Sequence, residues 1–206
     1  MNRNNNLRIA IDSWLKVKKL DEIVIIDWGS EIPVEDTLKE IVCDKIKIYR
    51  VDNAKVWCLT QAFNIAIKCS NYSNIYKFDC DDIVDKNVII DHPLTEKFFY
   101  SGNWEDASNI NELQINGKLF CSYKNLIQHN GYNENITTYG WDDSDIYNRL
   151  NTFLIMKTIN IKNFKFIEHD DCDRLTNTIL NNKVISIQIN RILEESDKFF
   201  RILSWS

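Results

Sequence analysis

The first eighty residues alternate between the apolar periods of helices and those of strands. Four apolar side chains at helical spacing predict an amphipathic helix near the amino terminus: Leu7, Ile11, Trp14 and Leu15. Two further helices are predicted by their apolar faces, one after Pro33 (Leu38, Ile41 and Val42) and one over residues 57–68 (Leu59, Phe63 and Ile67). Short apolar or alternating runs predict strands over residues 22–27, 45–51 and 74–78.

This alternation is typical of an α/β protein with a mainly parallel central sheet and flanking helices. In such sheets ligands bind beyond the carboxyl ends of the strands, and both Asp27 and residues 79–82 lie at such ends. A crossover helix normally joins two parallel strands, whereas this sequence opens on a helix. The first strand of the fold is therefore expected to be missing, or to be supplied in a different way.

Beyond residue 82 the pattern is less regular. Strands are predicted over residues 97–100, 118–123 and 163–167, with a hairpin at 113–119 because Asn116-Gly117 suits a tight turn. A helix is predicted from four apolar positions: Ile146, Leu150, Phe153 and Leu154. The polar tail has five apolar positions that we expect to close the core without contributing chemistry: Ile185, Ile187, Ile189, Ile192 and Leu193.

Composition and charge narrow the class of protein. A chain of 206 residues with only 5 Gly and 2 Pro indicates one domain with a sizeable core. The net charge of −5 and the lack of a basic run exclude nucleic acid as an expected partner. The 6 cysteines lack zinc-site spacing, so buried free thiols are expected. A polar amino terminus and the lack of a long apolar run predict no signal peptide, no membrane span and a cytoplasmic location.

Three carboxylates follow the strand predicted at residues 74–78, at Asp79, Asp81 and Asp82. Successive strand residues point to opposite faces, so Asp79 and Asp81 are expected to share a side while Asp82 points away. Burying such a strand beside this much negative charge is costly without a cation, and carboxylate oxygens suit Mg²⁺ or Mn²⁺. The alternative is a solvated acidic turn without a metal.

Two other polar groups are candidates for chemistry. Trp141, Asp142 and Asp143 begin a predicted helix, where acids commonly serve as caps. One acid is enough for that role, and an indole followed by two carboxylates also suits a sugar. His169 lies among acids at a strand end, where it is either structural or a metal ligand. His92 and His129 have no comparable setting.

These segments together resemble the GT-A glycosyltransferases, especially the family 2 enzymes, the chondroitin-polymerase type and the β-1,4-galactosyltransferases. The resemblance spans about residues 3–171. It is carried in order by residues 27–30 (Asp-Trp-Gly-Ser), 77–82 (Lys-Phe-Asp-Cys-Asp-Asp), 131–135 (Gly-Tyr-Asn-Glu-Asn) and 139–150 (Tyr-Gly-Trp-Asp-Asp-Ser-Asp-Ile-Tyr-Asn-Arg-Leu). It implies an inverting, metal-dependent transfer of a hexosyl or N-acetylhexosaminyl group from a UDP-sugar. The acceptor would be a hydroxyl of a glycan, glycoprotein or small molecule.

The resemblance also assigns roles to individual positions. It implies a Mn²⁺ or Mg²⁺ site at Asp79, Asp81 and His169, with Asp81 as a direct ligand. The residues implied to bind the donor are Arg3, Asp27, Asn64 and Asp79. Asp143 falls on the catalytic base, and the implied sugar or acceptor contacts are Gly140, Trp141 and Asp142.

The same resemblance implies a division of the single domain over residues 1–206. About 1–82 would bind the nucleotide, about 83–175 would bind the acceptor and carry catalysis, and 176–206 would form a tail.

The sequence departs from the family's pattern at three points. Gln61 stands where an Arg is usual, Asp142 is shorter than the usual Glu, and the first strand is absent. The alternative is therefore a GT-A-like module that binds a nucleotide or sugar without turnover. Nucleotidyl transfer would require a Gly-rich phosphate loop near the amino terminus, which the sequence lacks.

Overall fold

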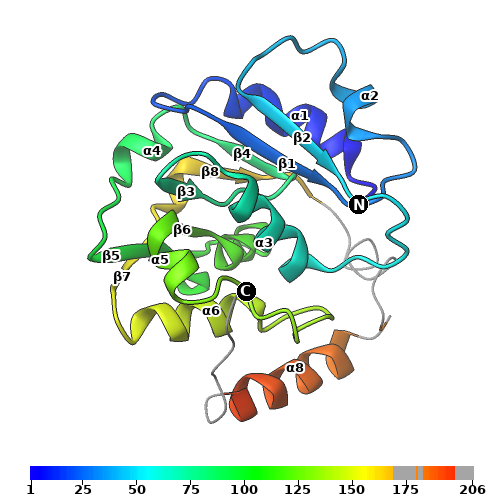
Figure 1. Cartoon of the computed structure of the whole chain (residues 1–206). Helices are drawn as coiled ribbons and strands as arrows, with labels where there is room; N and C mark the ends of the chain where they lie inside the picture. The colour runs from blue at the N-terminus through cyan, green and yellow to red at the C-terminus, as the bar shows by residue number, and fades with distance from the viewer. Residues whose placement is uncertain (169–179, 181–182, 198–206) are drawn as a thin grey trace.

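The computed structural model describes residues 1–168, 180 and 183–197 (Figure 1). The first part of the chain forms α1 (Asn4–Trp14), β1 (Ile23–Asp27), α2 (Val34–Leu38), β2 (Ile46–Arg50), α3 (Leu59–Cys69) and β3 (Asn74–Tyr76). All six elements lie where the hydrophobic pattern predicts them. In Figure 1, α1 lies behind β1 and β2, whereas α3 lies in front.

The remaining strands are β4 (Asp82–Val84), β5 (Phe98–Ser101), β6 (Leu119–Ser122), β7 (Ile155–Thr158) and β8 (Phe164–Phe166). The α-helices among them are α4 (Val88–Asp91), α5 (Tyr123–Gln128), α6 (Asp142–Asn151) and α8 (Lys183–Asp197). Three 3₁₀ segments complete this part: η1 (Trp104–Asp106), η2 (Asn111–Gly117) and η3 (Ile161–Asn163). The strands predicted near residues 97–100, 118–123 and 163–167 are thus confirmed.

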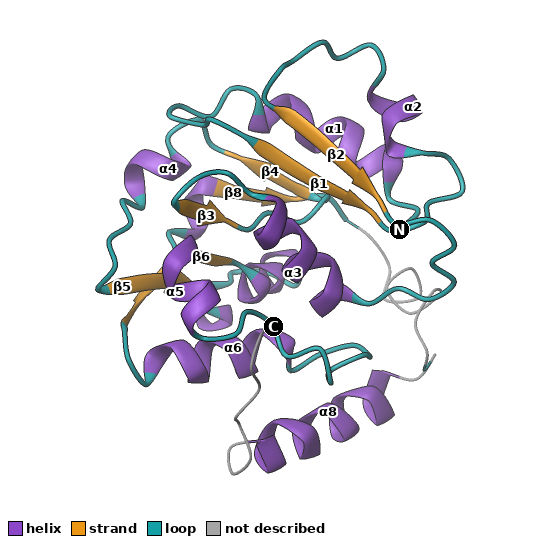
Figure 2. Cartoon of the chain, viewed as in Figure 1, coloured by secondary structure: helices purple, strands orange, loops and turns teal. Residues whose placement is uncertain are grey.

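The strands of the described residues form one parallel, one antiparallel and one mixed sheet, rather than a single mainly parallel sheet (Figure 2). The β1–β2 pair is parallel, as predicted. The largest sheet has the order β3-β6-β5-β7, in which β6 runs antiparallel to both neighbours and β5 runs parallel to β7. The β4–β8 pair is antiparallel. Helix periodicity revealed the α/β character, but pairing direction depends on contacts between distant segments.

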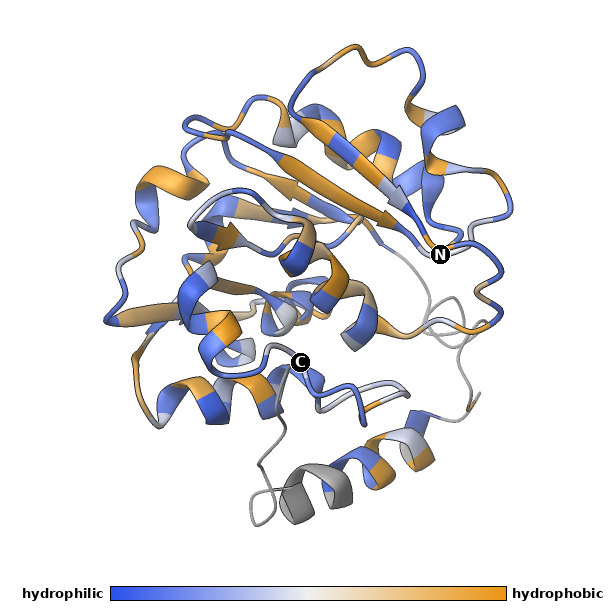
Figure 3. Cartoon of the chain, in the orientation of Figure 1, coloured by the Kyte–Doolittle hydropathy of each residue, from blue (hydrophilic) through white to orange (hydrophobic). Residues whose placement is uncertain are grey.

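The β3-β6-β5-β7 sheet separates two apolar cores. Along β6, Phe120 packs with α1 and β1, whereas Leu119 and Cys121 pack with α3 and α6. Tyr100 and Phe99 of β5 divide in the same way. This follows from the period of two along a strand, which sends successive side chains to opposite faces. The strongly apolar β1 and α4 are among the segments that are orange along most of their length in Figure 3.

Several sequence-based expectations are wrong in detail. No hairpin forms at residues 113–119, because Asn116 and Gly117 end η2 and the chain continues directly into β6. Val42 is 94% exposed because α2 ends at Leu38. Phe153 is 71% exposed because it follows the end of α6. Its ring stacks on that of His129.

The tail helix α8 contacts the rest of the protein through polar groups as well as apolar ones. Ser186 and Asn190 are buried, whereas Ile185 and Ile189 are 45% and 40% exposed. Asn190 Nδ2 donates to the carbonyls of Tyr139 at 3.2 Å and Gly140 at 2.8 Å. The expectation that the isoleucines of the tail close the core therefore fails at these two exposed positions.

Asn64 connects α3 to the loop at residues 132–134. Its Nδ2 donates to Tyr132 O at 2.9 Å and to Glu134 Oε1 at 2.8 Å, and its Oδ1 accepts from Tyr132 N at 2.8 Å. The side chain is 2% exposed. A buried amide with three such bonds fixes the loop against the helix.

We expect Asn64→Ala to lower the free energy of unfolding by about 2–4 kcal/mol, because it leaves a buried N–H and C=O of Tyr132 without their partner. Urea denaturation of the variant and the wild type measures this loss. Lys68→Ala, at an exposed position of α3, is the matched control and should change stability by less than about 0.5 kcal/mol. Equal stability of Asn64→Ala and wild type would contradict the structural role of this side chain.

Candidate functional site

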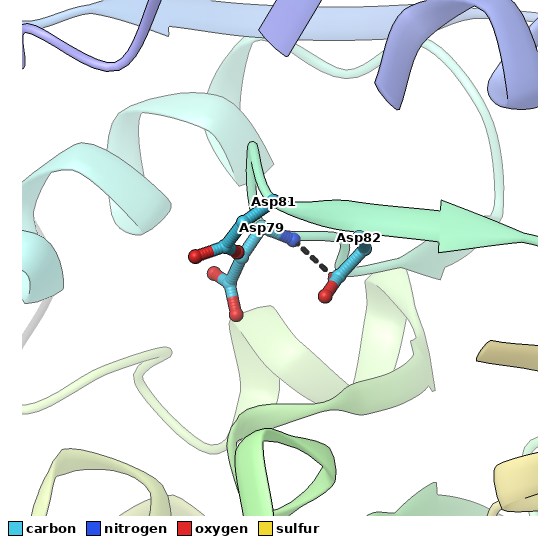
Figure 4. A group of neighbouring side chains, drawn as sticks. All are labelled: Asp79, Asp81 and Asp82. Atoms are coloured by element: carbon cyan, nitrogen blue, oxygen red, sulfur yellow. Dashed lines mark hydrogen bonds between the residues drawn. The ribbon is translucent and has the colours of Figure 1, made fainter. Parts of the chain in front are cut away.

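A tight turn over residues 79–82 brings the three carboxylates of the first acidic motif together. Asp82 N donates to Asp79 O at 3.0 Å, and Asp79 N donates to Asp82 Oδ2 at 2.6 Å. Figure 4 shows the carboxylates of Asp79 and Asp81 side by side, with Asp82 turned toward the backbone of Asp79. One oxygen from each residue lies within 4.8 Å of the others. The turn, rather than strand alternation, therefore creates the predicted pairing.

This oxygen-rich group fits a hard divalent cation. Carboxylate oxygens at such spacing are the ligands that Mg²⁺ and Mn²⁺ prefer. Asp79 and Asp81 present their oxygens to the same space, whereas one oxygen of Asp82 is already bound to a backbone N–H. Asp79 and Asp81 are accordingly the better ligand candidates.

Lys118 is the first cation that the structure places in this group. Its Nζ lies 2.5 Å from Asp79 Oδ2 and 2.9 Å from Asp82 Oδ1, and its side chain is 1% exposed. The contact to Asp82 is an ion pair without hydrogen-bond alignment. Burial raises the pKa of Asp82 to about 7, while the charge of Lys118 opposes that rise. Lys118 thus offsets part of the cost of burying the acids.

Lys77 links the first acidic motif to the second. Its Nζ lies 3.9 Å from Asp79 Oδ1 and 3.4 Å from Asp143 Oδ1, and it donates to Gly117 O at 2.5 Å. The ammonium group also lies 4.2 Å from the centre of the Phe63 ring, which adds a cation–π contact. One buried ammonium group therefore bridges acids that lie sixty-four residues apart in the chain (79 and 143).

Gly117 leaves the space in which these three side chains meet. A Cβ atom at this position would lie 3.3 Å from Asp143 Oδ2, 3.6 Å from Lys77 Nζ and 3.8 Å from Asp79 Oδ2. Any larger side chain would push into the contact between the acids and the lysine. Asn116 and Gly117, which the sequence pattern predicted to form a hairpin turn, therefore form part of the wall of the site.

A left-handed backbone turn sets the start of α6. Gly140 and Trp141 have φ values of 93° and 68°, and Asp142 follows as the first helical residue. Asp145 binds Arg149 through contacts of 2.7 and 2.9 Å, whereas Asp143 turns toward Lys77. Of the three acids in this helical turn, Asp145 thus forms a structural ion pair, whereas Asp142 and Asp143 line the cavity.

Asp142 and Asp143 are neighbouring acids, and the charge of Asp143 affects the ionisation of Asp142. Burial raises the pKa of Asp142 to about 8, and the charge of Asp143 adds to the rise. Burial also raises the pKa of Asp143, but Lys77 opposes it. Because Asp143 contacts the ammonium group of Lys77, we place the negative charge on Asp143, whereas the raised pKa of Asp142 keeps its proton near neutral pH.

Helix α8 supports this turn from outside. The guanidinium of Arg191 lies 5.9 Å from the Trp141 ring centre, in cation–π contact. Ile187 Cγ1 lies 3.1 Å from the position that a Gly140 Cβ would take. Part of the Trp141 ring is therefore engaged by α8, and the space beside Gly140 requires glycine.

A cavity of about 830 Å³ brings most of the predicted site residues together. Its lining includes seven of them: Arg3, Asp79, Asp81, Gly140, Trp141, Asp142 and Asp143. Asp27 and Asn64 are not among the lining residues. His169 lies outside the described residues.

Asp27 is placed at the end of β1, where it fixes the loop that follows. Its carboxylate accepts from Ser30 N at 3.0 Å and Val34 N at 3.1 Å, and it pairs with Arg50. Burial pushes the pKa of Asp27 up, but the hydrogen bonds from Ser30, Val34 and Arg50 outweigh it and hold the pKa below its ordinary value. Its donor-binding role stays a prediction.

Lys77, Lys118 and Gly117 are the site residues that the sequence analysis missed. Lys77 and Lys118 each occur at the edge of an apolar run, where an ammonium group is rarely buried without a carboxylate partner. That rule was a usable signal for Lys77, which lies just before Asp79, but not for Lys118, which lies far from both acidic motifs in the sequence.

We expect the stability of this protein to fall as pH rises, partly because Asp142 must ionise in a buried setting. An unfolded Asp has a pKa of about 3.9, whereas the folded pKa of Asp142 is about 8, so the destabilisation grows between these values. Asp142→Asn removes this destabilisation, because an amide does not ionise. The difference in Tm between the variant and the wild type should therefore increase from pH 5 to pH 8. Thermal melts in EDTA measure this.

The control for this measurement is Asp44→Asn, at an exposed position. Its Tm difference from wild type should not change over the same pH range. A pH-independent difference for Asp142→Asn would contradict the assigned pKa.

Comparison with known proteins identifies similar structures but no similar sequences. No protein-family model matches this sequence, and no curated protein matches it. A mannosyltransferase from Pyrobaculum calidifontis, solved with GDP-Man and Mn²⁺, is 12% identical with a TM-score of 0.60 over 75% of this chain and 51% of that one. This chain thus spans about half the length of that protein.

Two further structures cover more of the chain. The catalytic domain of Drosophila β1,4-galactosyltransferase 7, in complex with xylobiose, is 15% identical with a TM-score of 0.59 over 93% of this chain and 76% of that one. Staphylococcus aureus TarS 1–349 is 12% identical with a TM-score of 0.60 over 95% and 69%. At these identities the likeness concerns the fold, and the fold of this chain is that of the GT-A glycosyltransferases.

Proposed function

We propose that this protein transfers a sugar from a nucleotide-sugar donor, a UDP-sugar, to an acceptor hydroxyl with inversion and with a divalent cation. The observation that carries the proposal is the meeting of the Asp79–Asp81 pair with Asp143 in one cavity. A metal-ligand pair and a separate carboxylate base are the two groups that such a displacement requires. The GT-A fold supports the same chemistry by analogy.

Asp143 is the proposed base. Its carboxylate would take the proton of the acceptor hydroxyl as that oxygen attacks the anomeric carbon. Contact with Lys77 favours the charged form, which a base requires, and fixes the direction of the carboxylate. Position matters more here than basicity, because the hydroxyl loses its proton late in the attack.

Asp79 and Asp81 are the proposed ligands of Mn²⁺ or Mg²⁺, with His169 as a further candidate. A divalent cation held by these residues would supply positive charge near the leaving diphosphate. Lys118 keeps Asp79 and Asp82 in place from the buried side. Lys77 holds the base at the opposite edge of the same group of acids.

Donor and acceptor contacts are proposed from the lining of the cavity and from the resemblance. Arg3 lines the cavity and is proposed to contact the nucleotide directly. Asp27 and Asn64 use their polar atoms within the fold and would act on the donor by holding neighbouring loops. Gly140, Trp141 and Asp142 line the side of the cavity proposed for the sugar and the acceptor. The type of sugar follows the resemblance: a hexose or an N-acetylhexosamine.

The competing function is that of a binding module without turnover. It is favoured by the sheet arrangement, because β1 and β3 are not joined by a strand within the described residues. A panel of UDP- and GDP-sugars, incubated with Mn²⁺ and with EDTA, distinguishes the two functions by release of nucleoside diphosphate. Metal-dependent release from a UDP-sugar supports the enzyme, whereas UDP binding without release from any donor favours the module.

No helix in the described residues is both long and apolar enough to cross a bilayer. The cytoplasmic location stays a prediction of the sequence.

Asp143→Asn should reduce the transfer rate by about 10²–10⁴ while UDP affinity stays near that of wild type, because the amide cannot accept the hydroxyl proton. Initial rates at saturating donor, together with calorimetric titration of UDP, measure both quantities. Asp36→Asn is the matched control, since it also lies in the first turn of a helix but outside the cavity. An unchanged rate in Asp143→Asn would remove it from the role of base.

Asp81→Ala should weaken UDP binding in Mn²⁺ by at least about tenfold and leave the affinity measured in EDTA unchanged, because only the metal-mediated contact is lost. Isothermal titration under both conditions tests this. Asp85→Ala, at an exposed neighbouring acid, should behave as wild type. Identical affinities in Mn²⁺ for Asp81→Ala and wild type would exclude Asp81 as a ligand.

A further inference from the structure

The tail helix α8 contacts the segment that leads into α6, the helix that carries the proposed base. This segment, residues 138–141, lines the cavity of the acidic site. On α8 the contacts come from Ile187, Asn190 and Arg191, which share one face because the second and third lie three and four residues after the first. The tail, for which the sequence predicts no chemistry, therefore touches a wall of the site.

The backbone of this segment is strained where it enters α6. Gly140 and Trp141 have positive φ values, of 93° and 68°. A residue with a β-carbon rarely adopts this conformation, so the surrounding structure must hold Trp141 in it. The side chain of Trp141, which is the cap residue of α6, makes no capping hydrogen bond to that helix. We therefore looked for support of the turn from other elements.

Asn190 of α8 supplies such support. Its Nδ2 donates to Tyr139 O at 3.2 Å and to Gly140 O at 2.8 Å. Its Oδ1 accepts from Thr138 Oγ1 at 3.0 Å. The side chain is 1% exposed, so these bonds are shielded from water. One buried amide group thus binds three consecutive residues of the segment.

Packing restricts the same turn. Ile187 Cγ1 lies 3.1 Å from the position that a Cβ of Gly140 would take. The guanidinium of Arg191 lies 5.9 Å from the centre of the Trp141 ring. A shift of the turn would therefore break the hydrogen bonds of Asn190 and these contacts together.

The turn sets the direction of the proposed base. Asp142 is the first residue of α6 and Asp143 follows it, so both carboxylates move with the start of this helix. Asp145 N donates to Trp141 O at 2.9 Å, which joins the turn to the helix. Because a misplacement of about 1 Å can reduce a rate about a hundredfold, a turn that is free to shift would impair Asp143.

We propose that Asn190 is a positioning residue, which holds the turn before α6 and thereby fixes the direction of the Asp143 carboxylate. Its effect on the reaction rests on the proposed function, in which Asp143 is the base. Its effect on the turn is independent of that function, since it is measured without donor or metal.

The test compares Asn190→Ala with Gln188→Ala, which truncates an exposed side chain of the same helix. Amide exchange at Asp145, followed by NMR, should be at least about tenfold faster in Asn190→Ala than in wild type, because its acceptor belongs to the turn that Asn190 holds. For Mn²⁺-dependent release of UDP from the UDP-sugar that wild type turns over fastest, kcat should fall by about 10–100-fold while KM stays within about twofold. Gln188→Ala should match wild type in both measurements.

A second variant separates the donated hydrogen bonds from the size of the side chain. Asn190→Asp keeps the shape and the acceptor for Thr138 but removes the Nδ2 donors, so it should reproduce both changes. A lower Tm with unchanged exchange at Asp145 in both variants would assign Asn190 to attachment of the tail alone and overturn the proposal.

The two parts of the proposal fail separately. Faster exchange with an unchanged kcat would overturn the positioning role in the reaction. If wild type releases no UDP from any UDP-sugar, the proposed function fails and the role in catalysis fails with it. The exchange measurement then still decides whether Asn190 holds the turn.

Discussion

Five aspartates share one largely buried region of this protein, and the rest of the site depends on how their charge is balanced. They are Asp79, Asp81, Asp82, Asp142 and Asp143. Two buried ammonium groups, those of Lys77 and Lys118, lie among them. Carboxylates outnumber the lysines, and raising the pKa of Asp142 to about 8 removes only part of the excess. The remaining negative charge favours binding of a divalent cation in this region.

The lysines also connect the two halves of the chain. Lys77 precedes the turn that holds Asp79, and it contacts the acid that follows the start of α6. Gly117, from the segment between these two, gives them room. The proposed metal ligand Asp79 and the proposed base Asp143 are therefore both positioned by Lys77. A shift of either carboxylate would change the contact of Lys77 with the other.

The sequence predicted the elements of the first eighty residues because local periodicity determines them. It also indicated the acidic pair at Asp79 and Asp81, because residue type and spacing suffice for a ligand hypothesis. Strand direction in the second half was not readable, since it depends on which distant segments meet. The roles of Lys77 and Lys118 were missed for the same reason: a lysine in an apolar run acquires meaning only from its partner. The hairpin predicted at Asn116-Gly117 was wrong because this pair suits several kinds of turn, and here it ends the 3₁₀ segment η2.

Diffraction from crystals soaked with Mn²⁺ and UDP, recorded at a wavelength where manganese scatters anomalously, tests the central claim most directly. The account predicts one strong anomalous peak bonded to carboxylate oxygens of Asp79 or Asp81, on the side of the cavity that faces Asp143. Bound UDP with no peak at this position, or a peak held only by other residues, would contradict it.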